Sequence, residues 1–208
     1  VSGQGTAPEL ATIDFYKSKG HDVIPTGVGK DAPLAFTLPG VVDSLLTMLE
    51  RFGTKKISEV LEPAIKYATE GIPHYEYMLD KLDSPSTTQQ FELFPPGGFE
   101  VFYQNKTIPN PGDLLQQSAL GELLLKMTFA EEDSLMGRNM PLDEERVIGI
   151  QAARKCFYQG EIAEIFDKSS KSVGGILRKD DLRDYSAKIE KPVSTTFHGY
   201  EIYTHGTW

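Results

Sequence analysis

Apolar residues recur every three to four positions along much of the chain, which is the spacing of amphipathic helices. The clearest run extends from Val41 to Phe52 and stops at Gly53, a residue typical of the position just after a helix. A second run continues from Ile57 to Gly71, and Pro63 within it is expected to kink or split the helix. These runs predict two consecutive helices.

The same periodicity predicts further helices. A short amphipathic helix is expected to begin at Pro8, because proline suits the first turn of a helix. Asp113 is a candidate N-cap for a leucine-rich helix that reaches Met127. Residues 130–140 are acidic, contain two methionines and have no clear period, so they are expected to form a mobile loop. Three more helices are predicted, over residues 143–157, 161–168 and 179–185.

Strand signals are few. The apolar run Leu34–Leu38, which Pro39-Gly40 closes, predicts a buried strand. Near the end, apolar and polar residues alternate on both sides of His198-Gly199, which predicts a β-hairpin with a two-residue turn. Residues 83–112 are rich in proline and glycine and predict irregular structure, with a short hairpin around Val101–Tyr103. The chain is therefore expected to be rich in helix.

Composition excludes several classes of protein. The 208 residues are 39% hydrophobic and 25% charged, which is usual for a globular domain. A net charge of −9 argues against a nucleic-acid surface and against binding to anionic membranes. With Cys156 as the only cysteine, an internal disulfide and a cysteine-based zinc site are excluded. The cellular compartment stays open, and a homo-oligomer is one open alternative.

The two ends of the chain carry a hypothesis of their own. Val1 is not a methionine, and the sequence stops at Trp208, directly after a strand-like run. We interpret residues 1–208 as part of a single domain in a longer protein. The alternative is a complete small protein that has been processed.

The candidate binding motif is Gly3-Gln4-Gly5-Thr6, ahead of the predicted first helix. Its backbone N–H groups and the positive end of that helix favour a carboxylate, although an ordinary loop and helix cap explain the pattern better on sequence alone. The four histidines are far apart in sequence, so a helical zinc site is not predicted. Runs such as Glu131-Glu132-Asp133 are interpreted as solvated charge. No group of residues forms a convincing catalytic set.

Short segments, each weak alone, follow one another in a specific order and spacing: Gly3–Pro8, Leu38–Leu45, Arg51–Gly53, Leu61–Ile65, Glu70–Pro73, Pro109–Gln117, Phe157–Gly160, Gly174-Gly175 with Asp180–Leu182, and Pro192–Ile202. Together they resemble the large-chain region of the gamma-glutamyltranspeptidase family, which are N-terminal-nucleophile hydrolases. The resemblance implies an α+β fold, the helix-rich part of a four-layer αββα sandwich that is incomplete without the small chain. It also implies a precursor that cleaves itself and an N-terminal threonine nucleophile, with no cofactor or metal. That threonine lies beyond this chain in the family, so no catalytic residue is assigned here.

The resemblance implies that this chain provides one wall of the substrate pocket, at Gly3, Gln4, Gly5 and Thr6. In gamma-glutamyl-specific members, an arginine just before an Ala-Pro pair binds the substrate α-carboxylate, because a guanidinium can hold both oxygens. The matching positions before Ala7-Pro8 are Gln4 and Thr6, and neither is charged.

The implied substrate is thus a gamma-glutamyl compound or a related amide or acylated amine, as in glutathione metabolism. The implied partner is the small-chain region of the same precursor. Without that region the chain is expected to be inactive, and to aggregate or dimerise through the edges of its hairpin. The alternative is a non-catalytic homologue that serves as a binding or structural module.

Overall fold

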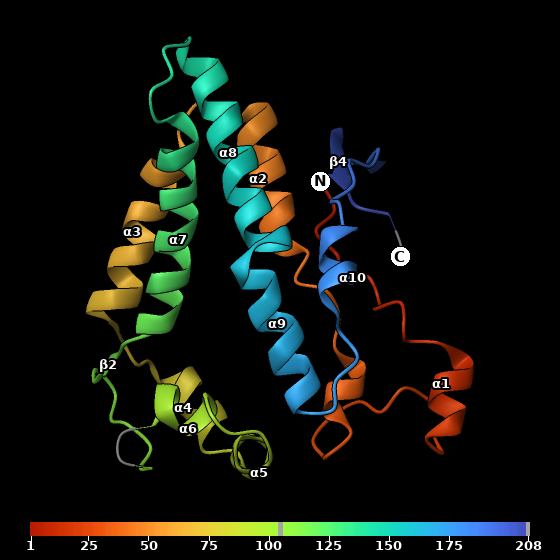
Figure 1. The fold of residues 1–208 in the computed structure, drawn as a ribbon. Coiled ribbons are helices and arrows are strands. Elements are labelled where there is room, and N and C mark those ends of the chain that lie inside the picture. Colours follow the sequence, from red (N-terminus) through yellow and green to blue (C-terminus); the bar gives the residue numbers. More distant parts are fainter. Residues whose placement is uncertain (104–105, 207–208) are drawn as a thin grey trace.

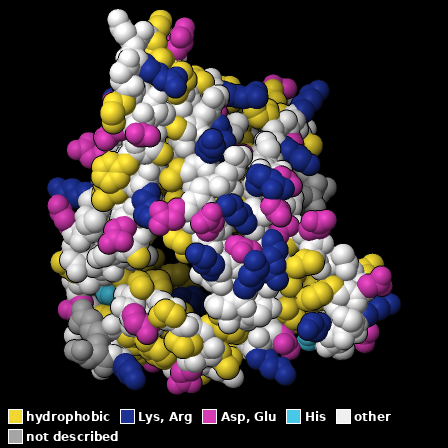
Figure 2. Space-filling model, in the orientation of Figure 1, with side chains coloured by type: hydrophobic (Ala, Val, Ile, Leu, Met, Phe, Trp, Pro, Cys, Tyr) yellow, Lys and Arg dark blue, Asp and Glu magenta, His cyan; other side chains and the backbone are white. Residues whose placement is uncertain are grey.

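The computed structural model describes residues 1–103 and 106–206 of the chain (Figure 1). Helices dominate, and the strands described form two separate antiparallel pairs, so the fold is α+β and rich in helix. Acidic and basic side chains are interspersed over the face drawn in Figure 2. Within the two described ranges, no helix combines the length and the apolar character that a membrane crossing requires.

Two long helices organise the molecule. α7 (Ser118–Leu135) and α8 (Leu142–Gln159) lie side by side and are joined by a short loop (Figure 1). α3 (Ile57–Glu70) packs mainly against α7, whereas α2 (Val41–Phe52) and α9 (Glu161–Ser172) pack against α8. The helices predicted over residues 41–52, 57–71, 143–157 and 161–168 are confirmed, with shifts of a few residues at their ends.

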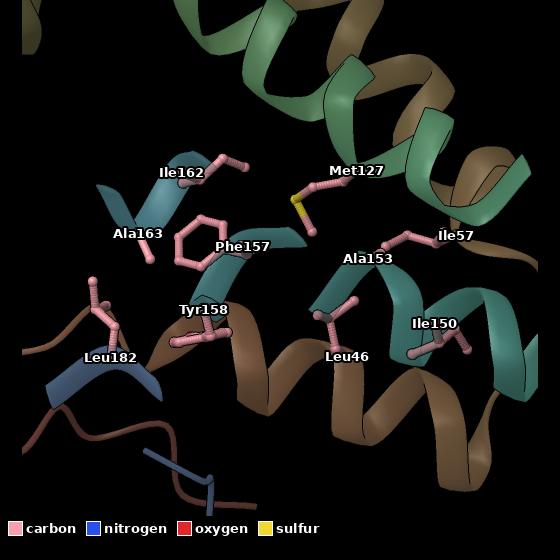
Figure 3. Close-up of a cluster of buried hydrophobic side chains, with 10 residues drawn as sticks. All are labelled: Leu46, Ile57, Met127, Ile150, Ala153, Phe157, Tyr158, Ile162, Ala163 and Leu182. Atoms are coloured by element: carbon pink, nitrogen blue, oxygen red, sulfur yellow. The ribbon is translucent and has the colours of Figure 1, made fainter. Parts of the chain in front are cut away.

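The main core lies where α8 meets its neighbours. Ile150, Ala153 and Phe157 follow helical spacing on α8 and are almost completely buried. Side chains from α2, α3, α7, α9 and α10 (Lys179–Arg183) converge on them (Figure 3). Full burial of one large apolar side chain stabilises a fold by about 1.5–3 kcal/mol, so this cluster holds the helices together. The other members are Leu46, Ile57, Met127, Tyr158, Ile162, Ala163 and Leu182.

A buried carboxylate fixes the start of α3. Glu131 of α7 is 1% exposed, and its two oxygens accept hydrogen bonds from the backbone N–H groups of Ile57 and Ser58, at 3.0 and 2.9 Å. First-turn N–H groups have no partner within their own helix, so Glu131 caps α3 from outside. Gly149 of α8 leaves room for this, because a Cβ there would stand 2.6 Å from the Glu131 Cγ. The expectation that Glu131 is solvated charge is wrong.

Arg146 of α8 provides hydrogen-bond donors for the C-terminal end of α2. Its Nη1 donates a hydrogen bond to the Leu49 carbonyl at 2.7 Å, and its Nη2 donates to the Glu50 carbonyl at 3.1 Å. A cation suits this position because the last carbonyls of a helix carry partial negative charge. Arg146 thereby fixes α2 to α8 at its C-terminal end.

Residues 83–112 contain more regular structure than the sequence predicts. The region holds two short helices, α5 (Pro85–Leu93) and α6 (Gly98–Phe102), and α4 (Glu76–Leu82) precedes it. The hairpin predicted around Val101 is wrong, because Val101 lies in α6. Pro85 is in the first turn of α5, where a missing N–H does no harm. Contacts among aromatic rings hold these short helices together. The rings are those of Phe91, Phe99, Phe102 and Tyr103.

The predicted C-terminal hairpin is confirmed. β3 (Val193–Phe197) pairs with β4 (Tyr200–Thr204), and His198 and Gly199 form the turn. Both turn residues have positive φ angles, 47° and 84°, as a tight two-residue turn requires. Every position in both strands is exposed.

The segment before α2 differs from its prediction. Residues Leu34–Leu38 do not form a strand, because Ala32–Ala35 makes a short 3-10 helix from which the chain runs on to Gly40. Leu34 and Leu38 are nevertheless buried. A short apolar run bounded by turn residues indicates burial, but it does not by itself distinguish a strand from a tight helical turn.

Contacts between distant segments also override local signals in α3 and α7. The strand pair formed by Ile72–Pro73 (β1) and Leu114–Leu115 (β2) replaces the helix start predicted at Asp113. α7 extends into the predicted loop over residues 130–140, because that part of it carries the carboxylate that caps α3. Pro63 does not split α3, since packing against α7 offsets its missing hydrogen bond.

We expect Glu131→Ala to lower the free energy of unfolding by about 2 kcal/mol, because two N–H groups at the start of α3 lose their acceptor. Urea unfolding followed by circular dichroism measures the change in the full-length protein. Glu132→Ala is the matched control, because Glu132 is exposed on the same helix. Equal stability of the two variants would contradict the capping role.

Candidate functional site

The candidate motif is held against the chain that follows α10. Ser2 and Lys188 form an antiparallel bridge, in which the Ser2 N–H donates at 2.7 Å and the Lys188 N–H donates at 3.3 Å. Two residues on, the Tyr185 hydroxyl donates a hydrogen bond to the Gln4 carbonyl at 3.1 Å. The backbone is thus fixed while the Gln4 side chain stays exposed.

The two glycines of the motif are required by close approach rather than by turn geometry. A Cβ on Gly5 would stand 1.9 Å from the Leu38 carbonyl oxygen, and one on Gly3 would stand 2.4 Å from the Ser44 Oγ. Neither glycine has a positive φ angle. The Leu38 N–H also donates to the Thr6 carbonyl at 3.1 Å. The motif therefore lies directly against the connection to α2 and its first turn.

The helix that was expected to follow the motif begins later. α1 (Ile13–Ser18) starts after Thr12, whose Oγ1 accepts a hydrogen bond from the Phe15 N–H at 3.1 Å. The alternative in which the positive end of this helix helps to bind a carboxylate at the motif loses its support, because six residues separate Thr6 from Ile13. The helix start beside the motif is that of α2, where a Cβ on Gly40 would stand 2.6 Å from the Gly3 carbonyl oxygen.

Asp43, in the first turn of α2, links segments that are far apart in the sequence. Its Oδ1 accepts a hydrogen bond from the Arg154 Nε at 2.6 Å, and its Oδ2 accepts one from the Ala187 N–H at 2.6 Å. The Asp43 N–H donates to the Tyr158 hydroxyl at 2.9 Å, and that hydroxyl donates to the Pro39 carbonyl at 2.6 Å. Although the carboxylate is buried, its oxygens are therefore well satisfied.

The same contacts shift the pKa values of this network. Burial alone would lower the pKa of Arg154, but its hydrogen bonds to Glu50 and Asp43 outweigh burial and raise it. Burial alone would raise the pKa of Glu50, but hydrogen bonds from Arg154 and Gln151 hold it below its usual value. Burial raises the pKa of Tyr158, so its hydroxyl remains a donor. The network therefore keeps Arg154 and Glu50 charged and positions the motif.

Gln4 and Thr6 line two different surface hollows, of about 400 and 500 Å³. The charged side chains around the Gln4 hollow are Glu190 and Lys191. Those around the Thr6 hollow are mostly acidic: Glu9, Asp180, Asp181, Asp184 and Lys188. An anionic group is therefore less favoured beside Thr6 than beside Gln4.

Sequence reasoning missed the side chains that hold the motif: Asp43, Arg154, Tyr158 and Tyr185. Asp43 and Tyr158 carried a usable signal, because they lie in the family-like segments Leu38–Leu45 and Phe157–Gly160. Among residues 1–103 and 106–206, no group of three His, Cys, Asp or Glu side chains is placed to hold a metal ion.

Comparison with known proteins assigns the family. A family model described as Gamma-glutamyltranspeptidase matches residues 1–208. This chain belongs to the gamma-glutamyltranspeptidase family. The resemblance inferred from the short sequence segments is confirmed, and the relatives of this chain include glutathione hydrolase proenzymes.

Individual members of the family agree with this assignment. The chain is 27% identical to the glutathione hydrolase-like YwrD proenzyme of Bacillus subtilis, over 97% of this chain and 33% of that protein. It is 28% identical to the glutathione hydrolase proenzyme of Escherichia coli, over 95% of this chain and 30% of that protein. The gamma-glutamyltranspeptidase structure from Helicobacter pylori matches with a TM-score of 0.76 and 28% identity, over 98% of this chain and 51% of that chain. The chain spans about a third of the length of these curated relatives.

We expect Gly5→Ala to displace the motif and to lower the free energy of unfolding by about 1–3 kcal/mol, because the added Cβ overlaps the Leu38 carbonyl. Gly206→Ala is the matched control, since nothing lies within 4 Å of the Cβ that it adds. Thermal unfolding of the full-length variants measures both. A Gly5 variant as stable as the control contradicts the close approach.

Proposed function

We propose that this chain is the large-chain portion of a self-processing, gamma-glutamyltranspeptidase-like amide hydrolase or acyltransferase. Gly3, Gln4, Gly5 and Thr6 form part of the wall of its substrate pocket. The observation that carries this proposal is the anchored motif, whose backbone is fixed at the start of α2 while Gln4 faces an open hollow. A rigid wall of this kind can hold a substrate in one orientation, which favours reaction.

The reactive group comes from polypeptide beyond the described residues. A threonine that self-cleavage exposes at a new N-terminus attacks the carbonyl carbon of the substrate amide, and its own α-amine takes the hydroxyl proton. The C–N bond then breaks, the amine leaves with that proton, and the acyl group stays on the threonine as an ester. The acyl group then passes from the threonine to water or to an amine acceptor, while backbone donors stabilise the developing negative charge. This chain supplies binding rather than a catalytic group, so we expect it to be inactive alone. The chemistry needs no cofactor.

An uncovered apolar stripe on α2 supports the proposal that a partner chain packs against this helix. Four residues at helical spacing are 40–72% exposed: Val41, Leu45, Met48 and Phe52. A different side of α2 packs against α8 through Leu46, so the helix is apolar on two sides. A helix that is apolar on two sides is normally covered on both.

The exposed hairpin supports the proposal of the same partner chain. Its register places three pairs on one face: Val193 with Thr204, Thr195 with Ile202, and Phe197 with Tyr200. That face is largely apolar and exposed, and a two-stranded hairpin alone is marginally stable in water. We therefore place the hairpin in a central layer of a four-layer αββα sandwich, which strands from the small chain of the same precursor complete.

Gln4, rather than Thr6, is the position that we assign to an anionic part of the substrate. The acidic side chains around Thr6 repel a carboxylate, whereas the Gln4 hollow is lined by Lys191 as well as Glu190. The Gln4 amide can donate a hydrogen bond but lacks the charge of an arginine, so it holds a carboxylate less strongly. The substrate is a gamma-glutamyl compound or a related amide or acylated amine.

The full-length precursor is expected to cut itself directly before a threonine, because this chemistry needs a free N-terminal amine. Intact-mass spectrometry reveals the two chains, and hydrolysis of a gamma-glutamyl anilide or a related amide reports activity. Alanine in place of that threonine is the control and abolishes both. The enzyme proposal is contradicted if the precursor stays uncut and cleaves no gamma-glutamyl anilide. That result would favour a non-catalytic homologue.

We expect Gln4→Arg to raise kcat/KM for a gamma-glutamyl anilide by about tenfold or more, because a charged donor binds a carboxylate more strongly than an amide does. Thr6→Arg is the comparison variant and gives no such gain, since its guanidinium pairs with the acidic side chains of its own hollow. Steady-state kinetics on the processed protein measures both. A larger gain at Thr6 would reverse the assignment.

A further inference from the structure

A hollow with an excess of positive charge lies apart from the candidate motif, between α1 and the C-terminal end of α9 (Figure 1). Its volume is about 370 Å³, which is within the usual range of small-molecule sites. Among the described residues, Asp31 is the one acidic side chain that lines it. This balance is the reverse of that in the whole chain, whose net charge is −9. We call this feature the basic hollow, and its cationic side chains are those of Lys19, Lys30, Lys171 and Arg178.

Arg178, directly before α10, is held in place by the backbone around it. Its Nη1 donates hydrogen bonds to the carbonyls of Gly175 and Leu177, at 3.0 and 2.9 Å. Its own backbone N–H donates to the Asp181 Oδ2 at 2.7 Å. The guanidinium is therefore fixed before any ligand arrives, and a fixed side chain loses little conformational entropy on binding.

The other edge of the Arg178 guanidinium is free. Its Nε and Nη2 make no hydrogen bond within the described part of the chain, and neither atom is buried. Arg183 shows what this edge can do, because its Nε and Nη2 donate to the two carboxylate oxygens of Asp184 at 2.8 and 3.1 Å. The geometry of two parallel donors matches a carboxylate. Since Arg178 lines the basic hollow and its Nη1 is occupied, the free edge is the part available to a ligand there.

The remaining charges leave the basic hollow with a small positive excess. Lys171 is already paired with Asp167, whose carboxylate lies 2.6 Å from the Lys171 Nζ. The same hydrogen bond from Lys171 holds the pKa of Asp167 below its usual value, so this carboxylate stays ionised and occupied. Asp31 offsets one further cation. The cations without an ion pair in the described part of the chain are Lys19, Lys30 and Arg178.

The floor of the basic hollow is apolar and rigid. Leu34 and Ile176 are buried, and they pack in one cluster with Tyr16 and Phe15. The Tyr16 hydroxyl donates a hydrogen bond to the Leu34 carbonyl at 2.7 Å, which fixes the cluster. The Lys19 Nζ lies 6.0 Å from the centre of the Phe15 ring, so positive charge borders the apolar surface directly. A ligand that uses the whole hollow needs an anionic head and an apolar body.

We propose that the basic hollow binds a small carboxylate that carries an apolar ring or branched chain. The carboxylate oxygens accept hydrogen bonds from the Nε and Nη2 of Arg178, and the apolar part packs on Leu34 and Ile176. The two unpaired lysines raise the local concentration of anions around the hollow. A cation is repelled by the same charges, and a neutral ligand leaves the free edge of Arg178 unused.

This site is separate from the one proposed for the amide substrate. The basic hollow shares no lining residue with the hollows at Gln4 and Thr6. The inference therefore does not depend on self-cleavage or on gamma-glutamyl chemistry, and it can fail or succeed independently of them.

Binding of three probes to the full-length protein tests the proposal, with ligand-observed NMR titrations as the measurement. Benzoate has a ring and a carboxylate, benzyl alcohol has the ring without the charge, and acetate has the carboxylate without the ring. We expect saturable binding of benzoate, about tenfold or more tighter than that of either of the other two. The comparison separates a site for both halves of the ligand from a general attraction for anions or for apolar rings.

Arg178→Ala should weaken benzoate by about tenfold or more, because it removes both donors of the free edge. Arg138→Ala is the matched control: it removes the same charge from an exposed residue that does not line the basic hollow, and it should leave the affinity for benzoate unchanged. Circular dichroism checks that both variants keep their helices.

A second pair of variants keeps the test decisive if Arg178→Ala alters the fold. Lys19→Glu places a negative charge at the basic hollow and should weaken benzoate by about threefold. Lys17→Glu makes the same change two residues earlier, at an exposed position that does not line the hollow, and should have no effect. The proposal is overturned if benzoate shows no saturable binding, if acetate or benzyl alcohol binds as tightly, or if the two lysine variants bind benzoate equally well.

Discussion

The buried carboxylate of Asp43 is the contact on which the geometry of the candidate site depends. It receives hydrogen bonds from Arg154 of α8 and from the backbone of Ala187, 144 residues away in the sequence. Ala187 directly precedes Lys188, whose backbone pairs with Ser2. One side chain therefore sets the position of α2 relative to α8 and of the N-terminal motif relative to both. A buried charge can do this only because its oxygens are satisfied by strong donors.

α2 is fixed at its two ends by two arginines of one helix. Arg154 reaches its start through Asp43, and Arg146 hydrogen-bonds to the carbonyls of its last turn. The apolar contact of Leu46 with the core lies between these two polar attachments. The rotation of α2 about its own axis is therefore determined, and so is the direction in which its uncovered apolar stripe faces. Charge placed at helix ends thus orients a surface that is itself uncharged.

The predictable parts of the molecule are those whose signals are local. Apolar spacing marked α8 because the face that the spacing defines is the face that packs. On α2 the spacing marked the helix too, although its apolar residues include an exposed stripe as well as the face that packs. The hairpin was predictable because His198 and Gly199 carry the whole signal for the turn. The capping role of Glu131 was not predictable, because the N–H groups that donate hydrogen bonds to it belong to a helix more than 70 residues earlier. The motif Gly3–Thr6 could be found through the resemblance to a family, but the side chains that anchor it come from distant segments and leave no pattern in the sequence around it.

The close approach of Gly3 and Gly5 to α2 and its connection has an evolutionary consequence. Any side chain at these two positions collides with Ser44 or with the Leu38 carbonyl, so substitutions there disturb the backbone. Gln4 lies between them with its side chain in solvent, and its own backbone is held by Tyr185. The residue at position 4 is therefore free to vary while the path of the loop stays constant. Under the proposed assignment of Gln4 to the substrate, ligand preference in a lineage of such proteins can diverge through single substitutions at this one position, without any loss of the scaffold that presents it.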